Sequence, residues 1–356
     1  MSPFIILFIL FFLYLSSKPK IRRYIERDGL YLSRTWTSFV NALFITLVVC
    51  SHGLILFKTN IRNFLPEKYT AYAISQFGQL IVTTFFFYSG FGIMSSILRK
   101  KEYHHKLLFP RFVQLSLYYV MAVLAYFVVY CLLQQKIHAA AFLHGLHNFQ
   151  ALGNPTWFII MTLIIYLLTW FAFKIMGQKH PMGTIGLLTL MLLIVMPMVS
   201  LFKPIHWVNT LLCFPAGMLY YLKGAKIEQI LKKTSIPSIV YAFILLGLGL
   251  FLHTSKLPAV IYMQNVGGIL FAVGVTWFAG SFIRNTPSRF LIWLGGSGLF
   301  AVYMFHLLPT RIMTHYELND GNPYLVWLIF IVSTGIFATV ANAAYNRINK
   351  LIFSRL

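Results

Sequence analysis

The chain has 356 residues, of which 59% are hydrophobic and only 10% are charged, and its net charge at pH 7 is +22. A soluble protein carries about 25% charged residues, so this composition excludes an ordinary soluble enzyme. Apolar runs close to the ~20 residues that span a bilayer recur along the sequence, which predicts an all-α, polytopic transmembrane helix bundle. Little sequence remains outside these runs, so we expect one membrane domain over residues 1–356.

Polar breaks divide the sequence into about eleven apolar segments. The first, at residues 3–16, is short, and a basic linker follows it to residue 36. Because its charges come after the apolar run, we interpret it as a retained span rather than a cleaved signal peptide. The later segments lie at residues 37–57, 78–98, 112–134, 157–176, 184–202, 206–222, 237–253, 263–283, 290–308 and 324–345.

The basic residues separate by side when the loops are assigned alternately to the two faces of the membrane. One face holds the loops 17–36, 99–111, 177–183, 223–236 and 284–289 and the C-terminal tail, and with Lys174 counted it receives 22 of the 29 Lys and Arg residues. The positive-inside rule makes this face cytoplasmic, with the N-terminus outside and the C-terminus inside. The charge is thus explained mainly by membrane topology, and no nucleic-acid partner is expected.

The acidic residues are predicted to lie in loops or at segment ends; they are Glu26, Asp28, Glu67, Glu102, Glu228, Glu317 and Asp320. Ion-coupled carriers usually hold a carboxylate at membrane depth, so this pattern argues against an ion-coupled pump. It also leaves histidine as the expected general base for chemistry inside the membrane. No metal is expected, since the H-x-x-H of loop 135–156 has no carboxylate or cysteine beside it.

The stretch FITLVVCSHGLILF, residues 44–57, contains one histidine, His52, in the outer third of segment 37–57. Asn41 precedes it by eleven residues, which puts both on one helix face, about 16 Å apart. An ionisable residue within a span is costly and is by default a functional hypothesis. The alternative is a structural histidine that bonds a neighbouring helix.

Further motifs follow in order along the chain. Residues 89–91 read S-G-F in a span that descends to a basic cytoplasmic loop, and Trp157 opens a later span. Tyr303 and His306 lie in the outer part of segment 290–308. The basic loop contains Arg99, Lys100, Lys101, His104, His105, Lys106 and Arg111.

Together these motifs resemble the acyltransferase-3 family of membrane O-acyltransferases over about residues 37–310. Members have an apolar span ending in histidine, an F-x-S-G-F-like span with a basic turn, a W-F-L-like span opening and a late Y-x-x-H-like segment. Asn41 stands where many members have arginine, which makes the chain more similar to the fucose-acetylase and adhesin-modifying branches. In the basic turn, Leu108 and Arg111 occupy the places of a common R-x-x-R pair, so one arginine is missing.

The resemblance implies transfer of an acyl group, usually acetyl, from acetyl-CoA on the cytoplasmic side to a hydroxyl of a glycan or its lipid-linked precursor. It also fits a bacterial cytoplasmic membrane. In this interpretation His52 is the general base, and His306 orients it or assists the leaving group. Several basic groups are needed for the phosphates of coenzyme A, and we expect them to be Arg99, Lys101, Lys106 and Arg111. The residues expected to contact substrate are Asn41, Trp157 and Tyr303.

Two other interpretations remain open. The same bundle would suit an exporter or flippase of polysaccharide, which need not bind a phosphate-rich soluble donor. It would also suit a structural partner in a polysaccharide synthase complex whose catalytic site has decayed, since Asn41 replaces the usual arginine.

Overall fold

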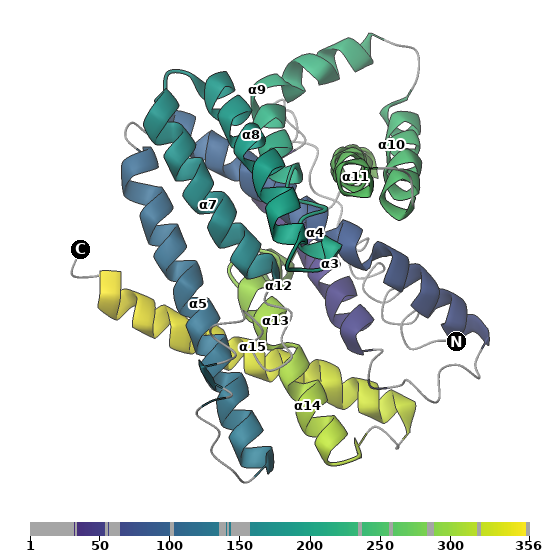
Figure 1. Ribbon diagram of the computed structural model, residues 1–356. Coiled ribbons are helices and arrows are strands. Elements are labelled where there is room, and N and C mark those ends of the chain that lie inside the picture. The colour runs from purple at the N-terminus through teal and green to yellow at the C-terminus, as the bar shows by residue number, and fades with distance from the viewer. Residues whose placement is uncertain are drawn as a thin grey trace.

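The computed structural model describes residues 32, 34–53, 56, 65–99, 103–134, 140, 142–143, 157–233, 237–255, 259–282, 288–318 and 322–353. Over these residues the chain forms helices and connecting turns without any strand (Figure 1), which confirms the predicted all-α bundle. The predicted first segment, 3–16, lies outside the described residues.

The first three described helices are α3 (Arg34–Gly53), α4 (Leu65–Arg99) and α5 (Tyr103–Gln134). The last two begin well before the predicted apolar segments 78–98 and 112–134, because helical structure continues into the polar sequence on their N-terminal side. The predicted loop 99–111 is therefore wrong in most of its length, and Arg111 lies on α5.

The middle of the chain adds two helical hairpins. A tight turn at Gly177, whose φ is 77°, joins the helices of the first hairpin, and glycine accepts this left-handed conformation without strain. Figure 1 shows the second hairpin, α10 (Ser238–Thr254) and α11 (Val260–Phe282), side by side at one flank of the molecule. The elements of this region are α7 (Trp157–Met176), α8 (Pro181–Ser200), η3 (Ile205–Trp207), α9 (Cys213–Lys232), α10 (Ser238–Thr254) and α11 (Val260–Phe282).

The predicted segment 290–308 is not one helix, which corrects the sequence-based assignment. It divides into α12 (Arg289–Leu294), α13 (Leu299–Phe305) and α14 (Leu307–His315). Gly295, Gly296 and Gly298 lie in the turn at the first junction, where a Cβ on Gly295 would lie 1.7 Å from the Ser38 carbonyl oxygen of α3. At the second junction Pro309 has no N–H for the carbonyl four residues earlier, so the helix changes direction.

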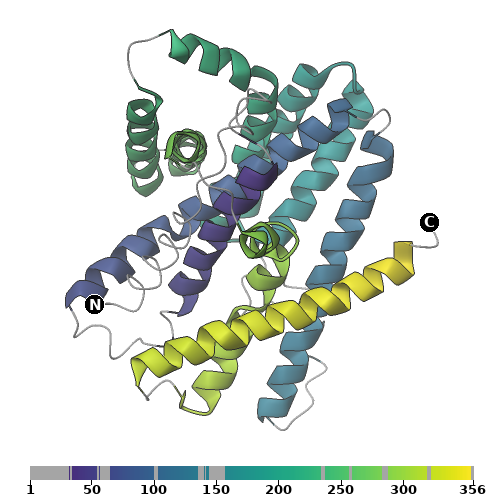
Figure 2. The same cartoon turned by 180° about the vertical axis from the view of Figure 1, so that it is seen from behind.

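The last helix, α15 (Pro323–Phe353), crosses obliquely over α5 and α14, as the reverse view in Figure 2 shows. Tyr118 of α5 stacks on Tyr345 of α15 with ring centroids 3.6 Å apart. The Tyr118 hydroxyl also donates a hydrogen bond to Asn342. These contacts fix the long final helix to the bundle.

Seven helices in the described part of the chain are long and apolar enough to cross a membrane, and a shorter apolar helix, Ser238–Thr254, joins them. This agrees with a polytopic arrangement. The remaining predicted segments correspond to α9 and to the broken α12–α14 region. The seven are Arg34–Gly53, Gly78–Arg99, Pro110–Gln134, Trp157–Met176, Pro181–Ser200, Val260–Ala279 and Leu325–Leu351.

Helix α4 lies at the centre of the bundle, since 78% of an 18-residue apolar stretch within Gly78–Arg99 is buried. Its S-G-F motif explains one close approach. A Cβ on Gly90 would lie 2.0 Å from the Phe214 carbonyl oxygen, and a Cβ on Gly217 would lie 1.9 Å from that of Phe87. The backbones of α4 and α9 are therefore in contact, which only glycine permits at these two positions.

Glu228 corrects the expectation that no carboxylate is buried. Helix α9 extends through most of the predicted loop 223–236, and this extension leaves the Glu228 side chain only 4% exposed. The Tyr220 hydroxyl donates a hydrogen bond to it at 2.9 Å, and Trp277 donates to the Tyr220 oxygen. A buried carboxylate needs such partners to offset the loss of hydration.

Candidate active site

Two histidines from distant parts of the chain meet inside the bundle. His52 lies in the last turn of α3, and His306 lies at the junction of α13 with α14. The His52 Nδ1 atom is 2.5 Å from His306 Nε2, and the two rings stack with centroids 4.8 Å apart and an angle of 13°. We call these two residues the histidine pair.

Backbone carbonyls determine which ring nitrogens of the pair carry hydrogen. His306 Nδ1 lies 2.8 Å from the Tyr303 carbonyl oxygen and 3.2 Å from that of Val302, so it must donate to them. In a neutral ring, His306 Nε2 is then an acceptor, and His52 Nδ1 must be the donor that it receives. The Nε2 atom of His52 is left with a free lone pair, as a general base requires.

The two histidines differ in accessibility. His306 is fully buried, with 0% of its surface exposed, whereas His52 is only half-buried. The end of α3 is held in place by α15, because a Cβ on Gly53 would lie 2.6 Å from Phe330. Only His52 can therefore meet a substrate, while His306 supports it from behind.

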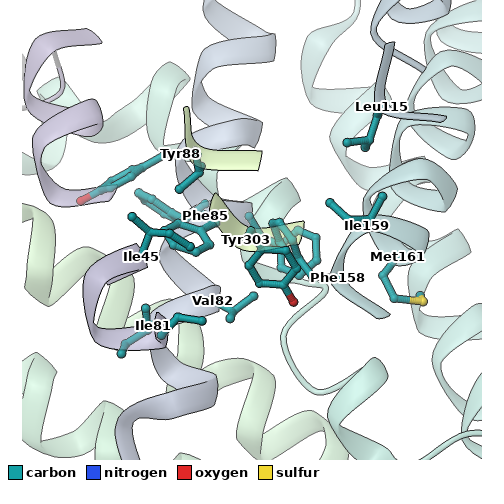
Figure 3. Close-up of a cluster of buried hydrophobic side chains, with 14 of the residues drawn as sticks. Ile45, Ile81, Val82, Phe85, Tyr88, Leu115, Phe158, Ile159, Met161 and Tyr303 are labelled. Carbon is teal, nitrogen blue, oxygen red and sulfur yellow. The ribbon is translucent and has the colours of Figure 1, made fainter. Parts of the chain in front are cut away.

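Aromatic side chains lead from the histidine pair to the start of α7. The Tyr303 ring lies edge-on to Phe158 at 5.2 Å and 6.2 Å from the His306 ring, and Figure 3 shows Tyr303 beside Phe158. Phe158 in turn lies 6.1 Å from Trp157. The structure thus brings the predicted residues Tyr303 and Trp157 into one group with the histidine pair. The buried Tyr303 hydroxyl has no hydrogen-bond partner among the described residues.

Asn41 contacts the turn between α12 and α13 and not the histidine pair. Its Nδ2 donates to the Gly295 carbonyl at 3.4 Å, and its Oδ1 is buried without a partner among the described residues. This junction is close-packed, since a Cβ on Gly295 would lie 1.7 Å from the Ser38 carbonyl oxygen. Asn41 therefore joins α3 to the turn after α12, and no direct contact with the histidine pair is observed for it.

Two of the predicted donor-binding residues, Arg99 and Arg111, lie where α4 ends and α5 begins, and we call this region the basic end. Arg99 is exposed in the last turn of α4, and Arg111 is half-buried on α5. Lys101 lies outside the described residues, and Lys106 is described only as part of the α5 backbone. Lys174, on the last turn of α7, lies 5.0 Å from the centre of the Trp170 ring.

A network of amide side chains beside Trp157 was not predicted from the sequence. Asn209 donates to Gln264 at 2.9 Å, and Gln79 donates to the His206 carbonyl at 2.6 Å. The His206 ring lies 5.8 Å from that of Trp157. Amide residues near the ends of apolar segments were the available signal, since a buried amide needs partners.

No group of three or more His, Cys, Asp or Glu placed to hold a metal occurs in the described part of the chain. The chemistry that the histidine pair itself offers is proton transfer by imidazole inside a membrane bundle. The fold and the histidine pair together define a class, namely polytopic membrane proteins that hold a candidate general base near one end of a spanning helix.

Comparison with protein families identifies the group. Residues 35–344 match the acyltransferase domain of the acyltransferase-3 family, and the chain belongs to that family. It is accordingly an integral membrane acyltransferase. The match includes the predicted region 37–310 and continues into α15. Comparison with curated proteins and with solved structures found no match.

Proposed function

We propose that this protein transfers an acetyl group from acetyl-CoA, bound at the basic end, to a hydroxyl of a cell-envelope glycan or its lipid-linked precursor. The observation that carries the proposal is the histidine pair, in which backbone carbonyls orient His306 and His306 orients His52. An exporter or a structural subunit has no need of such a chain of hydrogen bonds ending in a free imidazole nitrogen. The family match also favours a transferase.

In the proposed reaction, His52 Nε2 takes the proton of the acceptor hydroxyl while the hydroxyl oxygen attacks the thioester carbonyl carbon. The carbon–sulfur bond then breaks, the new ester is released, and the coenzyme A thiolate receives the proton from His52. His306 Nε2 accepts the His52 Nδ1 hydrogen throughout and so stabilises the imidazolium. Its position after the last turn of α13, whose C-terminal carbonyls carry partial negative charge, favours this role.

Arg111 and Arg99 are proposed to bind the phosphates of the donor from the cytoplasm. Arginine binds phosphate oxygens in a planar, bidentate manner, which suits a pyrophosphate. This assignment makes the basic end cytoplasmic, in agreement with the excess of Lys and Arg in the loops on that side. The acceptor then approaches from the outer face, where His52 is placed by the direction of α3. A bacterial cytoplasmic membrane suits this arrangement.

The test is transfer from labelled acetyl-CoA to extracted envelope glycan by the purified protein, comparing wild type with His52→Ala. The expected result is loss of transfer by a variant that still folds and binds donor. His253→Gln is the matched control, since His253 is also a buried helical histidine, and its Nδ1 atom lies 3.1 Å from the Gln264 carbonyl oxygen of α11. Absence of both donor binding and transfer in the wild type would refute the proposed function, and undiminished transfer by His52→Ala would refute the assignment of His52.

A further inference from the structure

A cavity that the reaction described above does not use lies between α5 and α14. Its volume is about 410 Å³, within the range of about 300–1,000 Å³ usual for small-molecule sites. We call it the α5–α14 cavity. Its lining residues are Tyr126, Val129, Tyr130, Leu133, Gln134, Arg311, Thr314 and His315.

Each helix contributes one continuous face. The α5 residues Tyr126, Val129, Tyr130 and Leu133 follow the i, i+3, i+4, i+7 pattern, so they line one side with aromatic and aliphatic groups. On α14, Arg311, Thr314 and His315 follow the i, i+3, i+4 pattern and are exposed. One wall is therefore largely apolar, and the other carries a cation and two hydrogen-bonding groups.

The described lining of this cavity carries a positive charge and no negative charge. None of its eight described lining residues is acidic. Glu317, the nearest acidic residue along the chain, follows the end of α14 and does not line the cavity. A guanidinium group beside histidine and threonine is the donor set that binds a phosphate group.

The depth of the cavity indicates where such a phosphate comes from. The α5 lining residues belong to the last nine residues of that helix, a length of about 12 Å. Tyrosines near the end of a spanning helix typify the level of the lipid head groups. On the same turns Leu132 is 72% exposed, as expected for a side chain that faces hydrocarbon. A lipid phosphate at this level would place its head on Arg311 and its chain along the apolar wall.

The cavity adjoins the histidine pair. Tyr126 packs with Leu307 and Leu308, the two residues that follow His306. Arg311 lies five residues after His306, about 8 Å along the chain axis. A glycan attached to a phosphate at Arg311 is thus within reach of His52.

We propose that the α5–α14 cavity binds the phosphate head of a long-chain lipid that carries the acceptor glycan, with Arg311 as the principal ligand. The inference rests on the proposed acyl transfer and specifies its acceptor as lipid-linked. It makes the cavity a binding site for the anchor of the substrate, whereas the reacting hydroxyl is placed at the histidine pair.

The test is binding of a fluorescent long-chain alkyl phosphate to the purified full-length protein in neutral detergent, followed by fluorescence anisotropy. We expect saturable binding that unlabelled alkyl phosphate displaces. An alkyl phosphocholine of equal chain length and inorganic phosphate should displace it poorly. Arg311→Gln should weaken binding about tenfold or more, as expected for loss of a charge-assisted pair, and Arg311→Lys should restore part of it.

A matched pair of variants tests the position of the lipid chain. Leu133→Trp fills the cavity and should abolish binding, whereas Leu132→Trp, one residue away on the exposed face, should leave binding unchanged. Equal displacement by phosphocholine or by inorganic phosphate would overturn the proposal. So would normal binding by Arg311→Gln, or equal losses in the two tryptophan variants.

This binding assay requires no acyl transfer, so the two proposals fail separately. Acetyl transfer to a soluble glycan without alkyl phosphate binding would overturn the lipid-anchored acceptor and leave the proposed function intact. Specific alkyl phosphate binding in a protein that transfers acetyl to no acceptor would overturn the proposed function instead.

Discussion

Replacing His306 by phenylalanine isolates the contribution of the histidine pair to the reaction. The ring is fully buried, so a ring of similar size should be accommodated without access for water. The substitution removes the Nε2 acceptor that lies 2.5 Å from His52 Nδ1. His52 then loses the contact that keeps its Nε2 unprotonated and turned toward the acceptor.

The expected loss can be worked from this contact. Leaving one buried hydrogen-bonding group without its partner costs about 1–3 kcal/mol. Because each 1.36 kcal/mol in the activation free energy is a factor of ten, kcat should fall by about 5- to 160-fold. Loss of a general base in His52→Ala should cost more, about 10²- to 10⁴-fold. His306→Gln, whose amide oxygen can accept from His52, should retain more activity than His306→Phe.

The assay is single-turnover transfer from labelled acetyl-CoA with saturating glycan, measured for both single variants and for the double variant. If His306 acts only through His52, the double variant will be no slower than His52→Ala alone. Unchanged KM for the donor is expected in each case, since the basic end is remote from the change. Multiplication of the two losses in the double variant would show that the residues act independently and would refute this account.

Two further variants test the packing and the donor site. Gly90→Ala places a Cβ 2.0 Å from the Phe214 carbonyl oxygen and should lower the free energy of unfolding, measured in a thermal melt, by about 1–3 kcal/mol. Gly92→Ala is the control and should not lower it, because a Cβ there has no neighbour within 4 Å. Equal effects of the two variants would contradict the close crossing of α4 and α9. Arg111→Gln should raise the KM for acetyl-CoA about tenfold. Arg289→Gln, which changes an exposed arginine, should leave this KM unchanged. A KM that the Arg111 change does not affect would show that Arg111 is not part of the donor site.

Most of the bundle could be predicted because each span is a long apolar run between polar residues. The predicted helix bounds were wrong where glycine and proline break a helix, because a hydropathy scale does not report how these residues change the backbone. Segment 290–308 is predominantly apolar, but its glycines and the following Pro309 break the helix at both ends of α13. Glu228 illustrates the opposite case. As a charged residue it was predicted to lie in a loop, but it is buried on α9, where the hydrogen bond from Tyr220 offsets the loss of hydration.

The candidate site was predictable in its residue types and not in its connections. The motifs indicated both His52 and His306, which are 254 residues apart, but no spacing rule gives the contact between them. Their tautomers depend on the carbonyls of Val302 and Tyr303, and a backbone oxygen has no signature in the sequence. Asn41 was expected in the substrate path from its helical spacing, and the structure adds its bond to Gly295.

The glycine-mediated crossing of α4 and α9 has a consequence for motion. Sliding between packed helices requires a layer of side chains that can change rotamers, and at Gly90 and Gly217 the two backbones touch without such a layer. We therefore expect these two helices to move as one body. The displacement needed to admit and release large substrates then falls on the segments around α13, whose two junctions already interrupt the helix on either side of that short element.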